Sequence, residues 1–241
     1  MKKTKIIMGL PITIEIVDKC LYSDINEVFG FFEYIDRVFS TYKKNSEISK
    51  INKGLIKNYS KDMKTVFVLA EKTKKETDGF FDIKFRGEID PSGIVKGWSI
   101  KKASNILKNK GYKNYYIEAG GDIEVVGKNL DKEWKIGIRN PWNLEEIIKV
   151  VKLKNKGIAT SGTYIRGNHI YNPHTKKNIN SNISLTVIAN NVYNADRIAT
   201  AAFSMGKEGI NFIENLKGYE GYLIDNKKNA TLTSNFNKYI I

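Results

Sequence analysis

Cysteine and histidine are both scarce in this chain, which contains one cysteine, Cys20, and two histidines, His169 and His174. A single cysteine excludes an internal disulfide, and no cluster of cysteine and histidine indicates a zinc site. A run of about 20 uncharged apolar residues is also missing, so the sequence predicts no membrane span. Residues 1–10 have the basic start of a signal peptide, but charged residues from Glu15 onward interrupt the apolar core that must follow. These absences predict a soluble, cytoplasmic protein.

Positive charge is what the 241 residues have in excess, because 40 Lys and Arg stand against 26 Asp and Glu, a net charge of +14. Such an excess first indicates nucleic acid or an anionic membrane surface as a partner. Only 5 of the basic residues are arginines, however, and arginine is the residue suited to bidentate contacts with guanine and phosphate. We therefore interpret the charge as the compositional bias of an AT-rich genome and predict no specific nucleic-acid partner.

The composition is otherwise that of a folded protein, with 41% apolar, 11% aromatic and 27% charged residues. No internal repeat, linker or break in composition divides the chain, so we expect one domain over residues 1–241. Apolar periodicity predicts helices over 24–41, 60–77, 94–110, 195–205 and 207–216, and strands over 12–16, 115–118, 123–126, 134–138, 147–153 and 184–189. Because the strands come in runs, we predict an α+β fold with a largely antiparallel or mixed sheet flanked by helices.

The predicted helix ends carry capping signals. Ser23 is placed to cap the first helix, and Ser46 is placed to cap a short helix that follows it, although no Glu or Gln completes a capping box. Gly111 follows the third helix, where a left-handed residue ends many helices. Tyr42 stands between the first two helices among several hydroxyl residues, and a simple helix end explains this segment without any function.

Two turns that contain glycine offer backbone groups to a ligand. Residues 89–97 open the third helix with Ser92 and Lys96, and a helix N-terminus beside a lysine favours an anion. The spacing is not that of a P-loop, and a capped helix start is the simpler explanation. Gly120 and Gly121 separate two strands and allow a ligand to approach the backbone, but a tight hairpin explains them equally well.

Asp196 and Thr200 are four residues apart in a predicted helix, so their oxygen atoms lie on one face. A carboxylate and a hydroxyl suit a hard cation such as Mg²⁺. On spacing alone the simpler alternative is that Asp196 is a favourable charge in the first helical turn and that Thr200 bonds back to its own helix.

Eight segments, taken together and in order, resemble the ApbE family of FAD:protein FMN transferases. They are 8–14, 39–42 with 46–52, 77–82, 90–97, 118–122, 158–162, 169–175 and 195–200. They include Asp-Pro-Ser-Gly-Ile-Val-Lys-Gly at 90–97, Glu-Ala-Gly-Gly-Asp at 118–122 and Ala-Asp-Arg-Ile-Ala-Thr at 195–200. The collinear order of segments that span nearly the whole chain carries the resemblance.

The resemblance implies an enzyme that binds FAD with Mg²⁺ and transfers FMN to a Thr or Ser hydroxyl of an acceptor flavoprotein, releasing AMP. It implies that Asp196, Thr200 and the backbone carbonyl of Val95 hold the metal. It implies that His169 helps to deprotonate the acceptor hydroxyl, a role for which a neutral imidazole with a pKa near 6.5 is suited. It further implies contacts with FAD for Tyr42, Ser92, Lys96, Gly120, Gly121, Thr160 and Ser161.

The chain also departs from the family pattern. Only residues 83–89 separate Asp82 from Asp90, where typical relatives carry a longer segment, and Asn172 and Lys176 replace a common Asp and Gly. The shortened segment bears on the choice of acceptor more than on FAD binding. Two alternatives therefore stay open: an FAD pyrophosphatase that releases FMN and AMP, and a non-catalytic FAD-binding protein.

Overall fold

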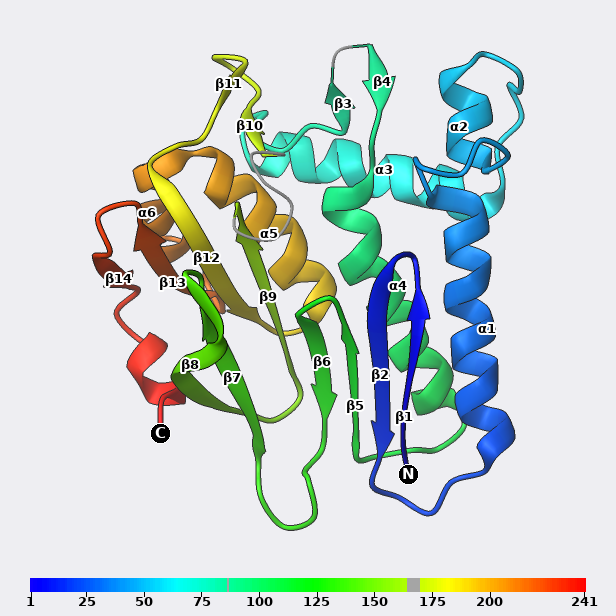
Figure 1. Ribbon diagram of the computed structural model, residues 1–241, viewed down its shortest axis with the longest axis vertical. Coiled ribbons are helices and arrows are strands. Elements are labelled where there is room, and N and C mark those ends of the chain that lie inside the picture. The colour runs from blue at the N-terminus through cyan, green and yellow to red at the C-terminus, as the bar shows by residue number, and fades with distance from the viewer. Residues whose placement is uncertain (86, 164–169) are drawn as a thin grey trace.

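An eight-stranded sheet forms the centre of the computed structural model, which describes residues 1–85, 87–163 and 170–241. The strand order is β1-β2-β5-β6-β9-β12-β13-β14, and every neighbouring pair is antiparallel. Its strands are β1 (Lys2–Ile7), β2 (Leu10–Ile16), β5 (Tyr115–Ala119), β6 (Asp122–Val126), β9 (Lys156–Gly162), β12 (Asn182–Ala189), β13 (Glu220–Asp225) and β14 (Ala230–Leu232). The α+β prediction is therefore confirmed, and Figure 1 shows the sheet running from the blue strands to the red ones.

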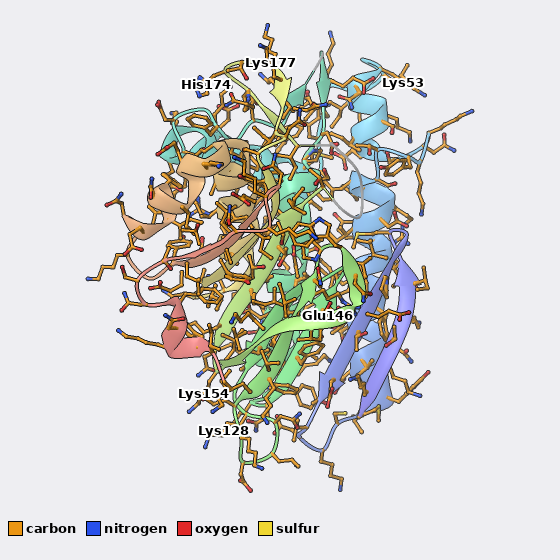
Figure 2. All side chains as sticks on the ribbon, turned by 60° about the vertical axis from the view of Figure 1, so that its left-hand side comes forward. Lys53, Lys128, Glu146, Lys154, His174 and Lys177 are labelled. Carbon is orange, nitrogen blue, oxygen red and sulfur yellow. The ribbon has the colours of Figure 1, made fainter. Side chains whose placement is uncertain are left out.

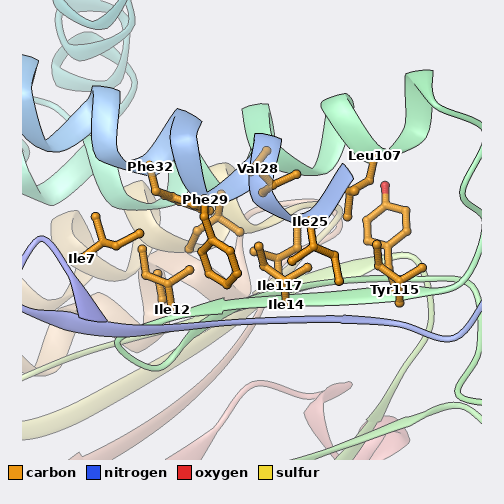
Figure 3. Packing of buried hydrophobic residues seen from close by; sticks show 14 of the residues in the cluster. Ile7, Ile12, Ile14, Ile25, Val28, Phe29, Phe32, Leu107, Tyr115 and Ile117 are labelled. Carbon is orange, nitrogen blue, oxygen red and sulfur yellow. The ribbon is translucent and has the colours of Figure 1, made fainter. Parts of the chain in front are cut away.

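Helices cover one face of this sheet. They are α1 (Tyr22–Phe39), α4 (Ser92–Asn109), α5 (Val192–Ser204) and α6 (Gly209–Glu214). Ile14 is the register partner of Ile117, and directly paired residues point to the same face, so both meet the helices. Figure 3 shows Phe29 and Phe32 of α1 packed against this face, and all four side chains are at most 1% exposed. Apolar burial of this kind contributes about 1.5–3 kcal/mol for each large side chain.

A hairpin of β7 (Trp134–Asn140) and β8 (Asn143–Leu153) packs on the opposite face and, within the described part of the chain, forms a separate two-stranded sheet. Trp134, Ile136 and Ile138 alternate inward along β7 and form a buried cluster with Ile123 and Ile158 of the sheet. The hairpin covers only part of this face. Glu15 of β2 and its register partner Tyr116 of β5 are half-buried.

The remaining elements gather at one end of the sheet, at the top of Figure 1. They are α2 (Glu47–Asn52), α3 (Lys61–Glu76), the short pair β3 (Lys84–Phe85) and β4 (Glu88–Ile89), and the pair β10 (Tyr171–Asn172) and β11 (Lys177–Asn178). Two 3₁₀ turns, Gly206–Glu208 and Phe236–Tyr239, complete the fold. No helix in the described part of the chain is long and apolar enough to cross a membrane.

Two of the three capping predictions are confirmed. The Ser46 hydroxyl accepts a hydrogen bond from the backbone N–H of Ser49, and Gly111 has the left-handed φ of +92°. The prediction for Ser23 is wrong, because α1 begins at Tyr22 and Leu21, whose side chain forms no cap, occupies the N-cap position. At this earlier start, the backbone N–H of Leu21 donates a hydrogen bond to the hydroxyl of Tyr112.

Candidate active site

A cavity of about 970 Å³ opens where the N-terminus of α4, the middle of α5 and the ends of β5, β6 and β9 meet. Its size is at the upper end of the range of small-molecule pockets. The structure brings eight of the predicted site residues to its wall. They are Ser92, Lys96, Gly120, Gly121, Thr160, Ser161, Asp196 and Thr200.

Asp196 owes its position to a close crossing of α4 and α5. Gly97 of α4 lies at the crossing, where a Cβ atom would be 2.6 Å from Cβ of Asp196 and 2.8 Å from the carbonyl of Val192. The backbone N–H of Gly97 donates a hydrogen bond of 2.7 Å to Oδ2 of Asp196. Only glycine permits this approach, so the residue that follows Lys96 in the sequence fixes the carboxylate of another helix.

A second carboxylate, Asp122 at the start of β6, is fully buried beside the first. Its Oδ1 accepts a hydrogen bond of 3.2 Å from the Thr160 N–H, and its Oδ2 lies 2.9 Å from Nζ of Lys96. Burial raises the pKa of Asp196 well above its usual range, and the nearby charge of Asp122 raises it further, against the opposing effect of Lys96.

The donor set around Asp196 fits Mg²⁺. Asp196 and Thr200 lie one helical turn apart on α5, and the Thr200 hydroxyl is 3.4 Å from the carbonyl of Gly93. Carboxylate, hydroxyl and carbonyl oxygens are the ligands that this hard cation prefers. Its charge would also offset that of the second buried carboxylate, Asp122. No cluster of three or more His, Cys, Asp or Glu side chains occurs among the described residues, so any cation here relies on a mixed oxygen set.

The two glycine turns have distinct geometries. Gly120 and Gly121 both have positive φ, +56° and +90°, which is the requirement of a two-residue type I′ hairpin between β5 and β6. The hairpin therefore accounts for the two glycines, and it also places them on the cavity wall. At the start of α4 the N–H of Ser92 is already engaged, since it donates 2.9 Å to Oδ1 of Asp90.

Two of the predicted residues that the structure describes, Tyr42 and Val95, do not line the cavity. Tyr42 is 92% exposed in the turn after α1, and it does not line the cavity. Val95 is buried within α4, and the carbonyl that approaches Thr200 is that of Gly93, two residues earlier. His169 lies outside the described residues.

The structure adds residues that the sequence reasoning missed as site residues. Asp122 is the most important of them, although the Gly-Gly-Asp segment that contains it was already part of the resemblance. Tyr116 lines the cavity and stacks on Trp134 at a centroid distance of 5.7 Å, which gives the cavity an aromatic wall. The Tyr116 hydroxyl donates to Glu118 at 2.5 Å, and burial, with Glu118 next, raises the pKa of this tyrosine.

Fold and cavity together define a class: an α+β protein whose pocket combines buried carboxylates, a lysine and backbone turns suited to an anionic ligand with a hard cation. The model of the ApbE family matches residues 8–88 and 84–223, and the chain belongs to this family.

Known relatives support the family assignment. A Vibrio cholerae protein named FAD:protein FMN transferase is 34% identical over 131 residues, which cover 50% of this chain and 39% of that relative. A Haemophilus influenzae protein of the same name is 25% identical, with 86% of this chain and 80% of the relative covered.

Solved structures show the same fold. The flavin transferase ApbE from Vibrio cholerae superposes with a TM-score of 0.86 at 23% identity, covering 99% of this chain and 98% of its own. The ApbE protein from Thermotoga maritima also has a TM-score of 0.86, at 21% identity and with the same coverage of both chains. At these identities the likeness concerns the fold, and the family assignment comes from the sequence match.

Proposed function

We propose that this chain is a cytoplasmic, Mg²⁺-dependent FAD:protein FMN transferase and that residues 1–241 form one flavin-transferase domain. The observation that carries the proposal is the convergence of Asp196, Thr200 and Lys96 on one cavity large enough for a dinucleotide, with the buried Asp122 paired to Lys96 behind its wall. The named relatives supply the reaction class, since each is a FAD:protein FMN transferase. The acceptor would be a flavoprotein that presents a Thr or Ser hydroxyl.

The metal would be held by Asp196 and Thr200, with a carbonyl of α4 as third ligand, that of Val95 by resemblance or that of Gly93 by proximity to Thr200. Mg²⁺ supplies charge neutralisation and Lewis acidity at a pyrophosphate. Lys96 adds a positive charge whose position is held by Asp122.

The remaining cavity residues would orient FAD. Ser92 lies at the N-terminus of α4, where the helix dipole favours phosphate oxygens. Gly120 and Gly121 let the ligand approach the backbone, and Thr160 and Ser161 offer hydroxyl groups from β9. The proposed flavin contact of Tyr42 rests on the resemblance alone.

In the proposed reaction the acceptor hydroxyl oxygen attacks the phosphorus of the FMN half of FAD. A new phosphoester bond forms, the bond to the bridging oxygen breaks, and AMP leaves with that oxygen. His169 is the proposed base that accepts the hydroxyl proton. Positioning and charge neutralisation supply most of the rate in transfers of this kind, which agrees with a site built of carboxylates, lysine and backbone groups.

The test is incubation of the protein with FAD, Mg²⁺ and a candidate acceptor flavoprotein, followed by flavin fluorescence on a denaturing gel and by measurement of AMP. Covalent flavin with equal AMP is expected. The variant Asp196→Asn should lose both products, whereas the matched control Asp131→Asn, in an exposed loop, should keep them. Free FMN without covalent flavin would instead identify a pyrophosphatase, and FAD binding without either product a non-catalytic flavin protein.

A further inference from the structure

Two segments that are distant in sequence form one rim of the cavity. Phe80 and Asp82, which follow α3, line it from one side, and Tyr171 and Pro173 of the β10–β11 hairpin line it from the other. Figure 1 shows β10 and β11 at the same end of the molecule as α3 and β3. The two segments therefore have to keep a fixed relative position if the cavity is to keep its shape.

His174, at the turn of the β10–β11 hairpin, joins the two segments. Its Nε2 lies 2.9 Å from the carbonyl oxygen of Asp78, and its ring lies on Phe80 with 4.4 Å between centroids. Because a carbonyl only accepts, the imidazole N–H is on Nε2 and donates. Gly79, between Asp78 and Phe80, has a φ of +76°, a conformation that favours glycine, and a Cβ there would only touch the ring, at 3.5 Å from Cε1 of His174. His174 thus contacts the segment after α3 through both a hydrogen bond and a ring contact.

The other attachments of the hairpin that the structure describes lie at its base. Among the described residues, β10 and β11 pair only with each other. Ile170 and Ile179 anchor the base of the hairpin in the core, each 8% exposed, and the Tyr171 hydroxyl donates to the carbonyl of Lys84 at 2.9 Å. The turn itself is held to the body of the protein through His174.

We propose that His174 is a positioning residue for FAD: it clasps the β10–β11 hairpin to the segment that carries Phe80 and thereby keeps the cavity rim in the form that binds the substrate. The inference rests on the proposed function, because it takes FAD as the ligand. His174 is exposed and does not line the cavity, so its effect acts through Phe80 and the hairpin rather than through contact with FAD.

Steady-state rates of Mg²⁺-dependent AMP release, with FAD varied, test the proposal. His174→Ala removes both the hydrogen bond and the ring contact, and it should raise KM for FAD roughly three- to tenfold, because a smaller fraction of the protein then has a closed rim. The value of kcat should stay within about twofold, since saturating FAD restores the bound form. His174→Gln, which keeps a side-chain N–H donor, should recover part of the KM.

Lys177→Ala is the matched control, because Lys177 is exposed on β11 of the same hairpin and outside the cavity wall; Figure 2 shows both residues at this end of the molecule. Its KM should equal that of the wild type. An unchanged KM in His174→Ala would overturn the clasp, and so would an equal rise in Lys177→Ala or a fall in kcat alone. If the wild type binds FAD without turnover, the proposed reaction fails, and the same variants compared by FAD fluorescence titration decide the clasp. If the wild type does not bind FAD, both proposals fail.

Discussion

Replacing Gly97 by alanine tests the close crossing of α4 and α5 on which the site depends. The added Cβ would lie 2.6 Å from Cβ of Asp196 and 2.8 Å from the carbonyl oxygen of Val192. The second of these atoms belongs to the backbone, so no side-chain rotation relieves the contact. The two helices have to separate, and the separation stretches the hydrogen bond of 2.7 Å from Gly97 to Asp196.

The expected change in stability is a balance of two effects. Alanine inside a helix is favoured over glycine by about 1 kcal/mol, which lowers the free energy of the variant. Overpacking of a tight contact costs about 1–3 kcal/mol, and here the overlap is with a backbone atom. We therefore expect Gly97→Ala to lose about 1 kcal/mol of unfolding free energy, a fall in Tm of about 2–4 °C for a chain of this size. The displacement of Asp196 should lower Mg²⁺-dependent turnover far more, by about 10²-fold.

Gly30→Ala is the matched control. Gly30 is also inside a helix, α1, but no atom lies within 4 Å of the position that its Cβ would take. The same helix preference should therefore raise Tm by about 2–4 °C without any change in turnover. Thermal unfolding by circular dichroism and AMP release measure the two quantities. If Gly97→Ala were as stable as Gly30→Ala and as active as the wild type, the argument from the helix crossing would be refuted.

Four further predictions concern charged groups. Since the pKa of Asp196 is raised by burial and by Asp122, protons compete with Mg²⁺, and isothermal titration should show tighter Mg²⁺ binding at pH 8 than at pH 6; equal affinities would contradict this. By the same shift, metal-free protein should lose stability as pH rises from about 4 through the folded pKa of Asp196, and Mg²⁺ should restore it in thermal melts. Lys96→Met should lower Tm by leaving Asp122 as an unpaired buried charge, and Lys96→Met with Asp122→Asn should recover it, which separates the ion pair from simple loss of packing. Hydrogen bonds from backbone N–H groups, that of Asn229 above all, lower the pKa of Asp225. This residue therefore stabilises the fold above about pH 4 and loses the effect as pH falls through its folded pKa. Asp225→Asn should make the free energy of unfolding less dependent on pH in this acidic range, and an unchanged dependence would argue against the assignment.

Sequence periodicity predicted the elements that present one apolar face to the core. The predicted stripe of α1, from Ile25 to Phe39, is buried as expected, because this helix packs on the sheet along a single side. β9 escaped prediction because its Thr160, Ser161 and Gly162 line a cavity and the strand shows no apolar alternation. β1 escaped because lysines fill this edge strand, a common protection against edge-to-edge pairing.

The same reasoning explains which parts of the site the sequence revealed. Asp196 and Thr200 are neighbours within one helix, so their spacing alone suggested a shared face. The pairing of Asp122 with Lys96, and the contact of Gly97 with Asp196, join residues that are far apart in the chain, the latter by 99 positions. Such contacts depend on how α4 packs on α5 and on the sheet. No local pattern encodes that packing.

The charge balance of the site gives the net charge of +14 a limited meaning. Among the residues that the structure describes, two buried carboxyl groups, Asp122 and Asp196, lie against one lysine, Lys96, so the cavity floor that these three form has more acidic than basic groups although the whole chain has an excess of basic ones. A surface lysine does not correct this deficit, because solvent screens it within about 10 Å. A divalent cation at Asp196 would reverse the sign of the floor and prepare it for a pyrophosphate. The local deficit therefore supports the proposed cation site better than the overall excess supports any partner.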